Sequence, residues 1–200
     1  MLGLVSCRAE PRSGLLHGLS PAGREQAARA PDALRAQLLR ARGGGGAGAA
    51  PADDDVWIYT SDFRRTRETA EALRDGLGLA RDRVRLAPQL RERDFGAFNL
   101  CADRPSYEAT WAADADAARP LGLWAEAAVE PAAAVQARAS AFVAALERAH
   151  RGATVCLVAH GDLLQILQTA FARRPAETHR SLPHLDTAEV RLLELAPRAE

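Results

Sequence analysis

Two short apolar runs predict β-strands that are buried on both faces. Residues 56–60 (VWIYT) combine β-branched and aromatic side chains, and residues 154–159 (TVCLVA) are apolar after their first position. Runs of this length and composition are typical of buried strands. Residues 84–90 are a weaker candidate for a short strand. Residues 187–195 alternate polar and apolar positions, as an antiparallel or edge strand would.

Helical signals lie between these runs. Ser20 is a natural N-cap, Pro21 suits the first helical position, and helix-forming residues continue to about Arg42. Ser61 and Asp62 are predicted to cap a second helix. That helix places apolar side chains on one face and ends at a glycine, the four positions being Ala70, Leu73, Leu77 and Gly78.

The second half of the chain continues the alternation of helices and strands. Two Ala-rich helices are predicted near 104–118 and 131–150, and a third begins at the turn His160-Gly161-Asp162 and ends near Phe171. Strands that alternate with helices favour an α/β layered domain with a mostly parallel sheet.

Length and composition indicate a single domain with no net electrostatic attraction for charged partners. We expect residues 1–200 to form a single domain with a flexible Gly/Ala-rich loop at 43–55. The 26 basic and 26 acidic residues give a formal net charge of zero. No nucleic-acid or anionic membrane partner is therefore expected. All of the basic residues are Arg, so chemistry that needs a Lys amine is excluded.

The cysteines predict neither a disulfide framework nor a metal site. Cys7, Cys101 and Cys156 are odd in number and widely spaced, with no C-x-x-C pair. No apolar run approaches the roughly 18 residues that span a bilayer, and the first residues lack the features of a signal peptide. We expect no cofactor and a cytoplasmic location, or an organelle if a transit peptide precedes the chain.

Three segments carry candidate chemistry. The turns that begin at Ser61 and at His160 each follow a predicted strand, and parallel sheets build their sites where such strands end. A helix N-terminus there offers free N–H groups to a phosphate, Arg65 adds a bidentate fork, and His160 can exchange protons. Glu92, between Arg91 and Arg93, is a candidate general acid or base. Each residue taken alone has an alternative interpretation. Arg65 and Glu92 would be surface charges, and His160 would be a structural residue of its turn.

Four segments in order resemble motifs of the histidine phosphatase superfamily, the phosphoglycerate mutase-like proteins. Residues 61–70 (SDFRRTRETA) resemble its S-x-L-x-R-A-x-Q-T-A signature, and residues 90–96 (LRERDFG) resemble its L-x-E-x-x-F/Y-G segment. Residues 158–161 (VAHG) resemble its second-histidine turn, and residues 19–27 (LSPAGREQA) its L-T-x-x-G-x-x-Q-A helix start. The likeness is greatest to a small plant- and algal-type branch.

The resemblance implies a fold and roles for particular residues. It implies a three-layer α/β/α sandwich and phosphomonoester hydrolysis through a phosphohistidine. Matched motif by motif, Arg65 would clamp the phosphate, His160 would be the second pocket histidine and Glu92 the proton donor. The N-terminus of the helix at Gly161 would add a phosphate contact. The ligand would be phosphate or a small phosphorylated metabolite.

The chain departs from the family at its nucleophile, because it contains no Arg-His-Gly motif. In one alignment, residues 4–10 (LVSCRAE) stand where the motif belongs in a degraded form. In the alignment that we prefer, residues 3–6 (GLVS) match a segment downstream of the motif, so that Met1 follows the first strand. That strand would then be missing or degenerate. Cys7 and Arg12 are one residue short of a C-x5-R phosphate loop, and His17-Gly18 lies too close to the Ser20 cap.

We therefore expect a histidine phosphatase-like chain that is a fragment or is inactive. The alternative is a pseudophosphatase that binds a phosphorylated ligand or regulates another protein without catalysis. Tyr107, Trp111 and Trp124 lie in the segment that would determine specificity, where packing is preferred over lining the pocket. Neither the substrate nor the oligomeric state can be inferred from these residues.

Overall fold

The computed structural model describes residues 16–41, 56–99, 104–116 and 127–197 and has a small parallel sheet at its centre. The strands are β1 (Val56–Thr60), β2 (Val84–Leu86) and β3 (Thr154–Val158), in the order β2-β1-β3. Both pairs are parallel, with Val56 opposite Thr154 and Ile58 opposite Val84. The prediction of a largely parallel sheet is confirmed, and both principal strands were located to within one residue.

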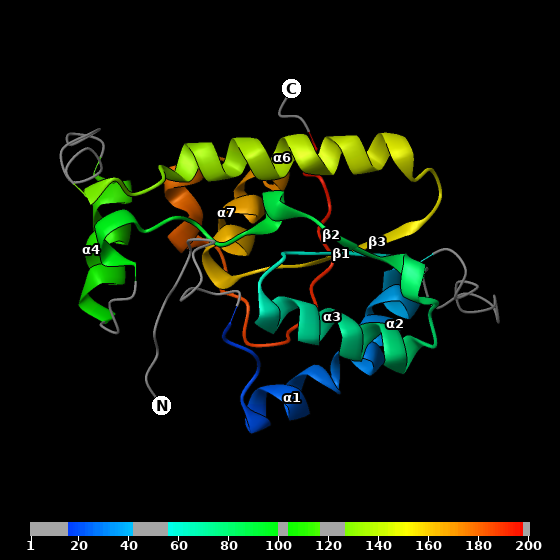
Figure 1. Cartoon of the computed structure of the whole chain (residues 1–200). Helices are drawn as coiled ribbons and strands as arrows, with labels where there is room; N and C mark the ends of the chain where they lie inside the picture. Colours follow the sequence, from blue (N-terminus) through cyan, green and yellow to red (C-terminus); the bar gives the residue numbers. More distant parts are fainter. Residues whose placement is uncertain (1–15, 42–55, 100–103, 117–126, 198–200) are drawn as a thin grey trace.

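Helices cover both faces of the sheet, which gives three layers (Figure 1). On one face α2 (Ala30–Ala41) and α3 (Arg64–Leu77) pack on β1 around Leu34, Ile58 and Leu73. On the other face α6 (Ala132–Ala149) and α7 (Gly161–Phe171) form a second apolar cluster around Val135, Leu163 and Ile166. The α/β expectation therefore holds.

The predicted first helix is divided in two. The Ser20 side chain caps α1 (Pro21–Ala27) by accepting a hydrogen bond from the Gly23 N–H. The chain then turns at residues 28–29 before α2 begins. Pro31 lacks the N–H that would continue the first helix and suits only the first turn of a new one. The prediction of a single helix that continues to Arg42 was wrong for this reason.

The predicted cap of α3 was also wrong, whereas its end was correct. The N-cap is Phe63, and the side chains of Ser61 and Asp62 make other contacts. Gly78 ends the helix in the left-handed conformation, with φ of 71°.

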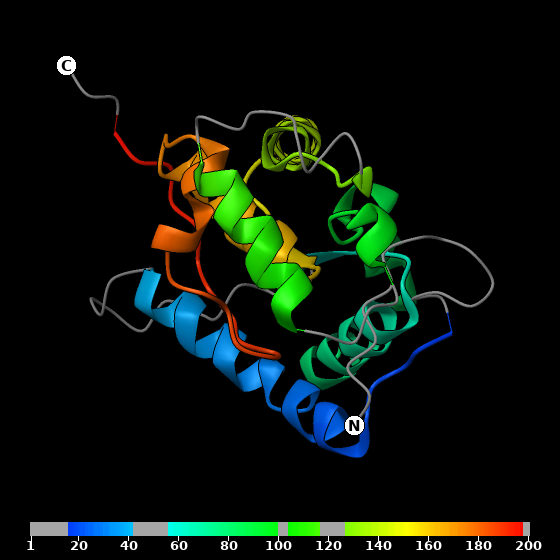
Figure 2. The same cartoon turned by 90° about the vertical axis from the view of Figure 1, so that its left-hand side faces the viewer.

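The predicted strand at 84–90 is shorter in the structure. It ends at Leu86, and Pro88–Leu90 form a 3-10 turn because proline cannot donate to a ladder. The helices α4 (Arg104–Ala115) and α6 confirm the two predicted Ala-rich helices. Viewed from the end in Figure 2, α4 crosses in front of the layered core.

The predicted edge strand at 187–195 has no regular secondary structure. No described strand pairs with it, and an alternating pattern alone does not supply the ladder hydrogen bonds that define a strand. The predicted loop at 43–55 lies outside the described residues. Within the described ranges, none of the helices is long and apolar enough to traverse a bilayer.

Candidate functional site

The segments that follow the three strands meet at the carboxyl end of the sheet. Arg65 comes from the first turn of α3, Glu92 from the loop after β2, and His160 and Gly161 from the start of α7. All four line one cavity of about 760 Å³. The structure thus brings together every residue that the sequence singled out as a phosphate contact or proton carrier.

His160 is held by two side chains. Its Nδ1 lies 2.9 Å from Arg65 Nη2, and its Nε2 lies 3.0 Å from Ser61 Oγ. Because a guanidinium only donates, Nδ1 accepts and Nε2 carries the proton of a neutral ring. Burial and the positive charges of Arg65 and Arg138 keep the pKa of His160 well below its ordinary value. The ring is therefore neutral at physiological pH in the unliganded site.

Arg65 is positioned by the turn between β1 and α3. Its guanidinium lies 4.9 Å from the centre of the Phe63 ring, which also meets His160 edge-on. Thr66 fixes this turn, because its hydroxyl donates to the carbonyls of Ser61 and Phe63. Stacking at one face holds the planar fork beside His160, to which its edge donates.

Glu92 occupies the N-terminus of α7. Its Oε1 accepts from the Leu163 N–H at 3.0 Å, and its Oε2 accepts from the Asp162 N–H at 3.4 Å. Burial, followed by the charge of Asp162, raises the pKa of Glu92 to about 7. The helix start that was expected to receive a phosphate thus already holds a carboxylate, and that carboxylate exchanges a proton near neutral pH.

A buried ion-pair network lies behind Glu92. Arg93 is fully buried and makes a bidentate pair with Asp114 at 2.6 and 2.9 Å. Its Nη1 is also 3.4 Å from Asp162 Oδ2, and Trp111 Nε1 donates to Asp162 Oδ1 at 2.9 Å. Burial alone would raise the pKa of Asp162, but its contacts with His179, Arg93 and Trp111 lower it. Asp162 therefore stays ionised beside Glu92.

Sequence reasoning missed this network and the contact between Ser61 and His160. Asp162 follows His160-Gly161 directly, so its position next to a candidate site was a usable signal. Asp114 and His179 come from distant segments, and nothing in their local sequence marks Asp114 as the partner of Arg93 or His179 as a neighbour of Asp114.

Tyr107 and Trp111 pack against each other, which is the preferred alternative, and Tyr107 also lines the cavity. The ring centre of Tyr107 lies 4.8 Å from that of Phe95 and 5.5 Å from that of Trp111. Trp124 lies outside the described residues.

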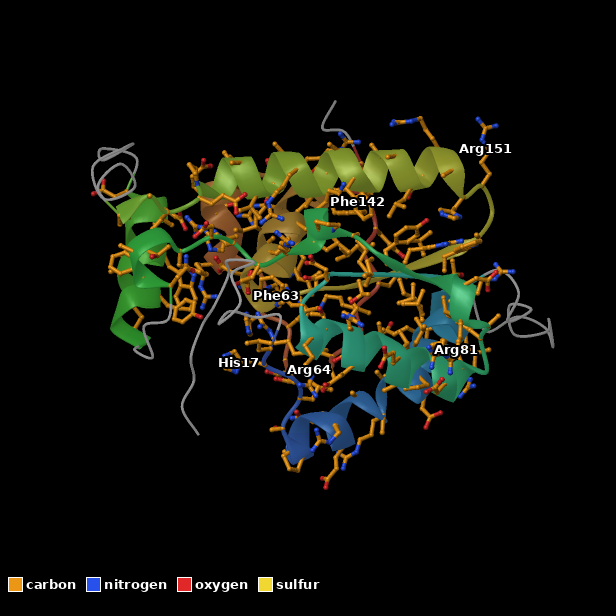
Figure 3. All side chains as sticks on the ribbon, viewed as in Figure 1. His17, Phe63, Arg64, Arg81, Phe142 and Arg151 are labelled. Carbon is orange, nitrogen blue, oxygen red and sulfur yellow. The ribbon has the colours of Figure 1, made fainter. Side chains whose placement is uncertain are left out.

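The other candidate nucleophiles do not reach this site in the described part of the chain. His17 is exposed beside Arg64 ahead of α3, and it is not among the residues that line the cavity (Figure 3). Cys7 and Arg12 lie outside the described residues. No group of three or more metal-ligating side chains occurs in the ranges that the structure describes.

A model of the histidine phosphatase superfamily, branch 1, matches residues 16–199. The chain belongs to this superfamily. The match takes in both turns and the Glu92 loop of the site. No curated protein matches the chain.

Several solved structures share the fold. A mycobacterial glucosyl-3-phosphoglycerate phosphatase in complex with VO3 is 26% identical, with a TM-score of 0.64 over 93% of this chain and 80% of its own. The same enzyme with inorganic phosphate is 30% identical, with a TM-score of 0.57 over 91% and 83% of the two chains. Bacillus stearothermophilus YhfR is 23% identical, with a TM-score of 0.65 over 94% and 80%, which shows the fold alone.

Proposed function

We propose that this chain binds inorganic phosphate or the phosphoryl group of a small metabolite at Arg65 and His160, and that it does not hydrolyse the ester. The observation that carries the proposal is the contact between Arg65 and His160 at one end of the cavity. An arginine fork beside a buried imidazole is suited to the oxygens of a tetrahedral anion.

Binding would change the protonation of His160. The positive charges of Arg65 and Arg138 help to keep the ring neutral, and a phosphate dianion would offset them. The protonated ring has two N–H donors, so the anion and the imidazolium stabilise one another. Arg65 would then turn part of its fork from Nδ1 of His160 towards the ligand.

Glu92 would supply the proton for a leaving oxygen. A carboxyl group with a pKa of about 7 is protonated in a large fraction of molecules at neutral pH, which suits a general acid. The 200 residues nevertheless contain no Arg-His-Gly motif. Two further histidines, His150 and His184, line the cavity, and neither belongs to such a motif. We infer that the site retains phosphate contacts and a proton carrier without an aligned nucleophile.

Hydrolysis is the second candidate function. It is favoured by the family and by solved relatives that are named as phosphatases. A small phosphorylated metabolite is the proposed ligand in either case.

Calorimetric titration with inorganic phosphate tests the binding site. Arg65→Met removes the fork and keeps a long apolar stem, so the affinity should fall about 10- to 100-fold. Arg67→Met is the matched control, because Arg67 is exposed on the same helix and does not line the cavity. Equal affinities for the unmodified chain and the Arg65 variant would contradict the proposal.

A further inference from the structure

One face of α4 reaches the candidate site with three side chains. Tyr107, Trp111 and Asp114 are spaced four and three residues apart, so they lie on the same side of the helix. Tyr107 lines the cavity, and the Trp111 indole N–H donates to Asp162 at 2.9 Å. Asp114 pairs with Arg93. Figure 1 shows α4 at the end of the molecule, separate from the helices that cover the sheet. This helix therefore touches both the cavity and the buried ion-pair network.

The position of α4 is fixed by aromatic and polar contacts. Arg180 lies over the Trp111 ring at 3.8 Å, and the Tyr107 ring centre lies 5.5 Å from that of Trp111. Arg180 also donates to Gln165 in α7 at 2.5 Å. The side chain of Asp114 is only 3% exposed. These contacts hold α4 against α7 and deliver the Asp114 carboxylate to the network in one position.

Arg93 divides its donors unequally between two carboxylates. Its two terminal nitrogens contact both oxygens of Asp114 at 2.6 and 2.9 Å, whereas the contact of Nη1 with Asp162 is 3.4 Å long. Its Nε donates to the Glu130 carbonyl at 2.7 Å. His179 Nε2 lies 3.6 Å from Asp162 and 3.9 Å from Asp114, and it adds a positive charge only when it is protonated. With that ring neutral, one guanidinium serves two carboxylates, and these groups hold one negative charge in excess.

Glu92 lies directly against this excess charge. Its Oε2 accepts from the Asp162 N–H at 3.4 Å. Burial favours the neutral form of a carboxyl group, and a negative charge beside it favours that form further. Both causes raise the pKa of Glu92, burial first and the charge of Asp162 second. The proton on Glu92 therefore depends on how far Arg93 compensates the charge of Asp162.

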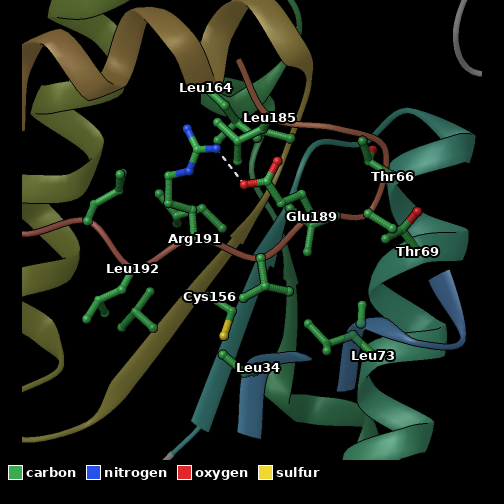
Figure 4. Close-up of a pocket in the computed structure, with 18 of the residues that line it drawn as sticks. Leu34, Thr66, Thr69, Leu73, Cys156, Leu164, Leu185, Glu189, Arg191 and Leu192 are labelled. Carbon is green, nitrogen blue, oxygen red and sulfur yellow. Dashed lines mark hydrogen bonds and ion pairs between the residues drawn. The ribbon is translucent and has the colours of Figure 1, made fainter. Parts of the chain in front are cut away.

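Other charged or titratable groups approach Glu92 or share its cavity from α3, α6, α7 and the C-terminal segment, and they include Arg65, Glu130, Arg138, His160, His184, Glu189 and Arg191. The carboxylates among them are paired, Glu130 with Arg138 at 2.7 Å and Glu189 with Arg191 at 2.5 Å (Figure 4). The Arg65 cation lowers the pKa of Glu92. The negative charge that acts on Glu92 therefore comes from Asp162, within the cluster that Asp114 completes.

We propose that Asp114 of α4 is a positioning residue for the proton of Glu92. By binding the Arg93 guanidinium with both oxygens, Asp114 limits the positive charge that reaches Asp162. The remaining negative charge favours the protonated form of Glu92 near neutral pH. The inference rests on the proposed function only in assigning this proton to an oxygen of the bound phosphate. Because Tyr107 lies on the same face of α4, a ligand that displaces this helix would also change the charge beside Glu92.

A 13C NMR titration of the unliganded full chain, labelled at the glutamate carboxyl carbons, tests this proposal. The Glu92 resonance is identified by its absence from the Glu92→Gln variant, and its midpoint in the unmodified chain should lie at about pH 7. Asp114→Asn removes one negative charge with almost no change in size. The affinity of Glu92 for its proton should therefore fall at least about tenfold. Asp162→Asn should cause a larger fall, because Asp162 acts on Glu92 directly.

Two further variants separate the charge of Asp114 from its place in the helix. Glu108→Gln is the matched control, since it removes an exposed carboxylate from the same helix and should leave the Glu92 midpoint unchanged. Asp114→Glu keeps a negative charge beside Arg93. It should restore most of the proton affinity that Asp114→Asn loses.

Phosphate binding gives a second measurement. A tenfold loss of proton affinity lowers the protonated fraction of Glu92 at pH 7 from about one half to about one tenth, so Asp114→Asn should weaken phosphate binding about fivefold. At pH 5 Glu92 is protonated in nearly all molecules of both chains, and the two affinities should agree. A loss of equal size at both pH values would show that Asp114 has a structural role only.

A Glu92 midpoint that is the same in Asp114→Asn and in the unmodified chain would overturn the proposal. Should Asp114→Asn unfold, trimethylamine N-oxide favours the compact state and allows the titration. If that variant still does not fold, Asp162→Asn decides the matter, since an unchanged midpoint there would exclude the cluster as the source of the charge. A chain that binds no phosphate at any pH would contradict the proposed function instead, and the titration of the unliganded chain would still decide this inference.

Discussion

At the scale of single residues, the chemistry of the site depends on which charges are neutralised. Arg93 shares its charge with two carboxylates, whereas Glu92 has an ionised Asp162 beside it and accepts hydrogen bonds from backbone N–H groups. Glu92 therefore carries the raised pKa of the cluster. The N–H groups at the start of α7 lower the cost of its charge but do not cancel the effect of burial.

Glu92→Gln should change how stability depends on pH. In the unfolded chain Glu92 has its ordinary pKa of 4.5, and in the folded chain about 7. Between these values the folded state holds a proton that the unfolded state has lost, so its contribution is fully present below pH 4.5 and is lost as the pH rises through 7. Glutamine removes this loss and should stabilise the chain at pH 8, relative to pH 4.5, by on the order of 1–3 kcal/mol. Urea unfolding at both pH values measures the difference.

The control for this prediction is Glu71→Gln, an exposed position on α3. It should leave the pH dependence of the free energy of unfolding unchanged. If Glu92→Gln has the same small effect at both pH values, Glu92 does not titrate near neutrality.

Arg93→Met should destabilise the chain by about 3–5 kcal/mol, because it leaves Asp114 buried without its partner. Denaturant unfolding measures this loss. The double variant Arg93→Met/Asp114→Leu removes both charges and should recover part of it. A double variant that is less stable by the sum of the two single effects would show that the pair is not coupled.

At the scale of secondary-structure elements, the sequence predicted those whose signals are local. Residues 56–60 and 154–158 form strands because continuous apolar runs suit a sheet with helices on both faces, and Gly78 ends α3 because it adopts positive φ. Residues 187–195 show where such reasoning fails, since an alternating segment becomes a strand only beside a partner. Ser61 was predicted as a cap, but its hydroxyl contacts His160, which lies 99 residues away.

A position can require glycine because its φ is positive or because there is no space for a Cβ, and Gly78 and Gly96 distinguish these two reasons. Both Gly78 and Gly96 have positive φ, at 71° and 55°, but a Cβ on Gly78 would meet open space. A Cβ on Gly96 would collide with the Ala127 carbonyl. Gly78→Ala should therefore cost about 1–2 kcal/mol from conformation alone. Gly96→Ala should cost clearly more, and similar values from denaturant unfolding would argue against this packing of the Glu92 loop.

At the scale of the whole molecule, one cavity joins the phosphate contacts to the edge of β3. The sequence could place Arg65, Glu92 and His160 at the same end of the sheet, because parallel strands bring their carboxyl ends together. It could not show the cavity, which arises from the way α2, α3, α6 and α7 enclose the space beside β3. It also could not show that Glu92 already caps α7. Both features depend on contacts between segments that are far apart in the chain.

The most direct test of the account is 31P NMR of the full chain with a simple phosphomonoester such as phenyl phosphate. We predict a shifted or broadened ester resonance that the Arg65→Met variant abolishes, with no inorganic phosphate formed over many hours. Steady release of inorganic phosphate that is lost in the Arg65 variant would contradict the claim that this site binds without hydrolysis. An ester resonance that the protein leaves unchanged would contradict the binding site itself.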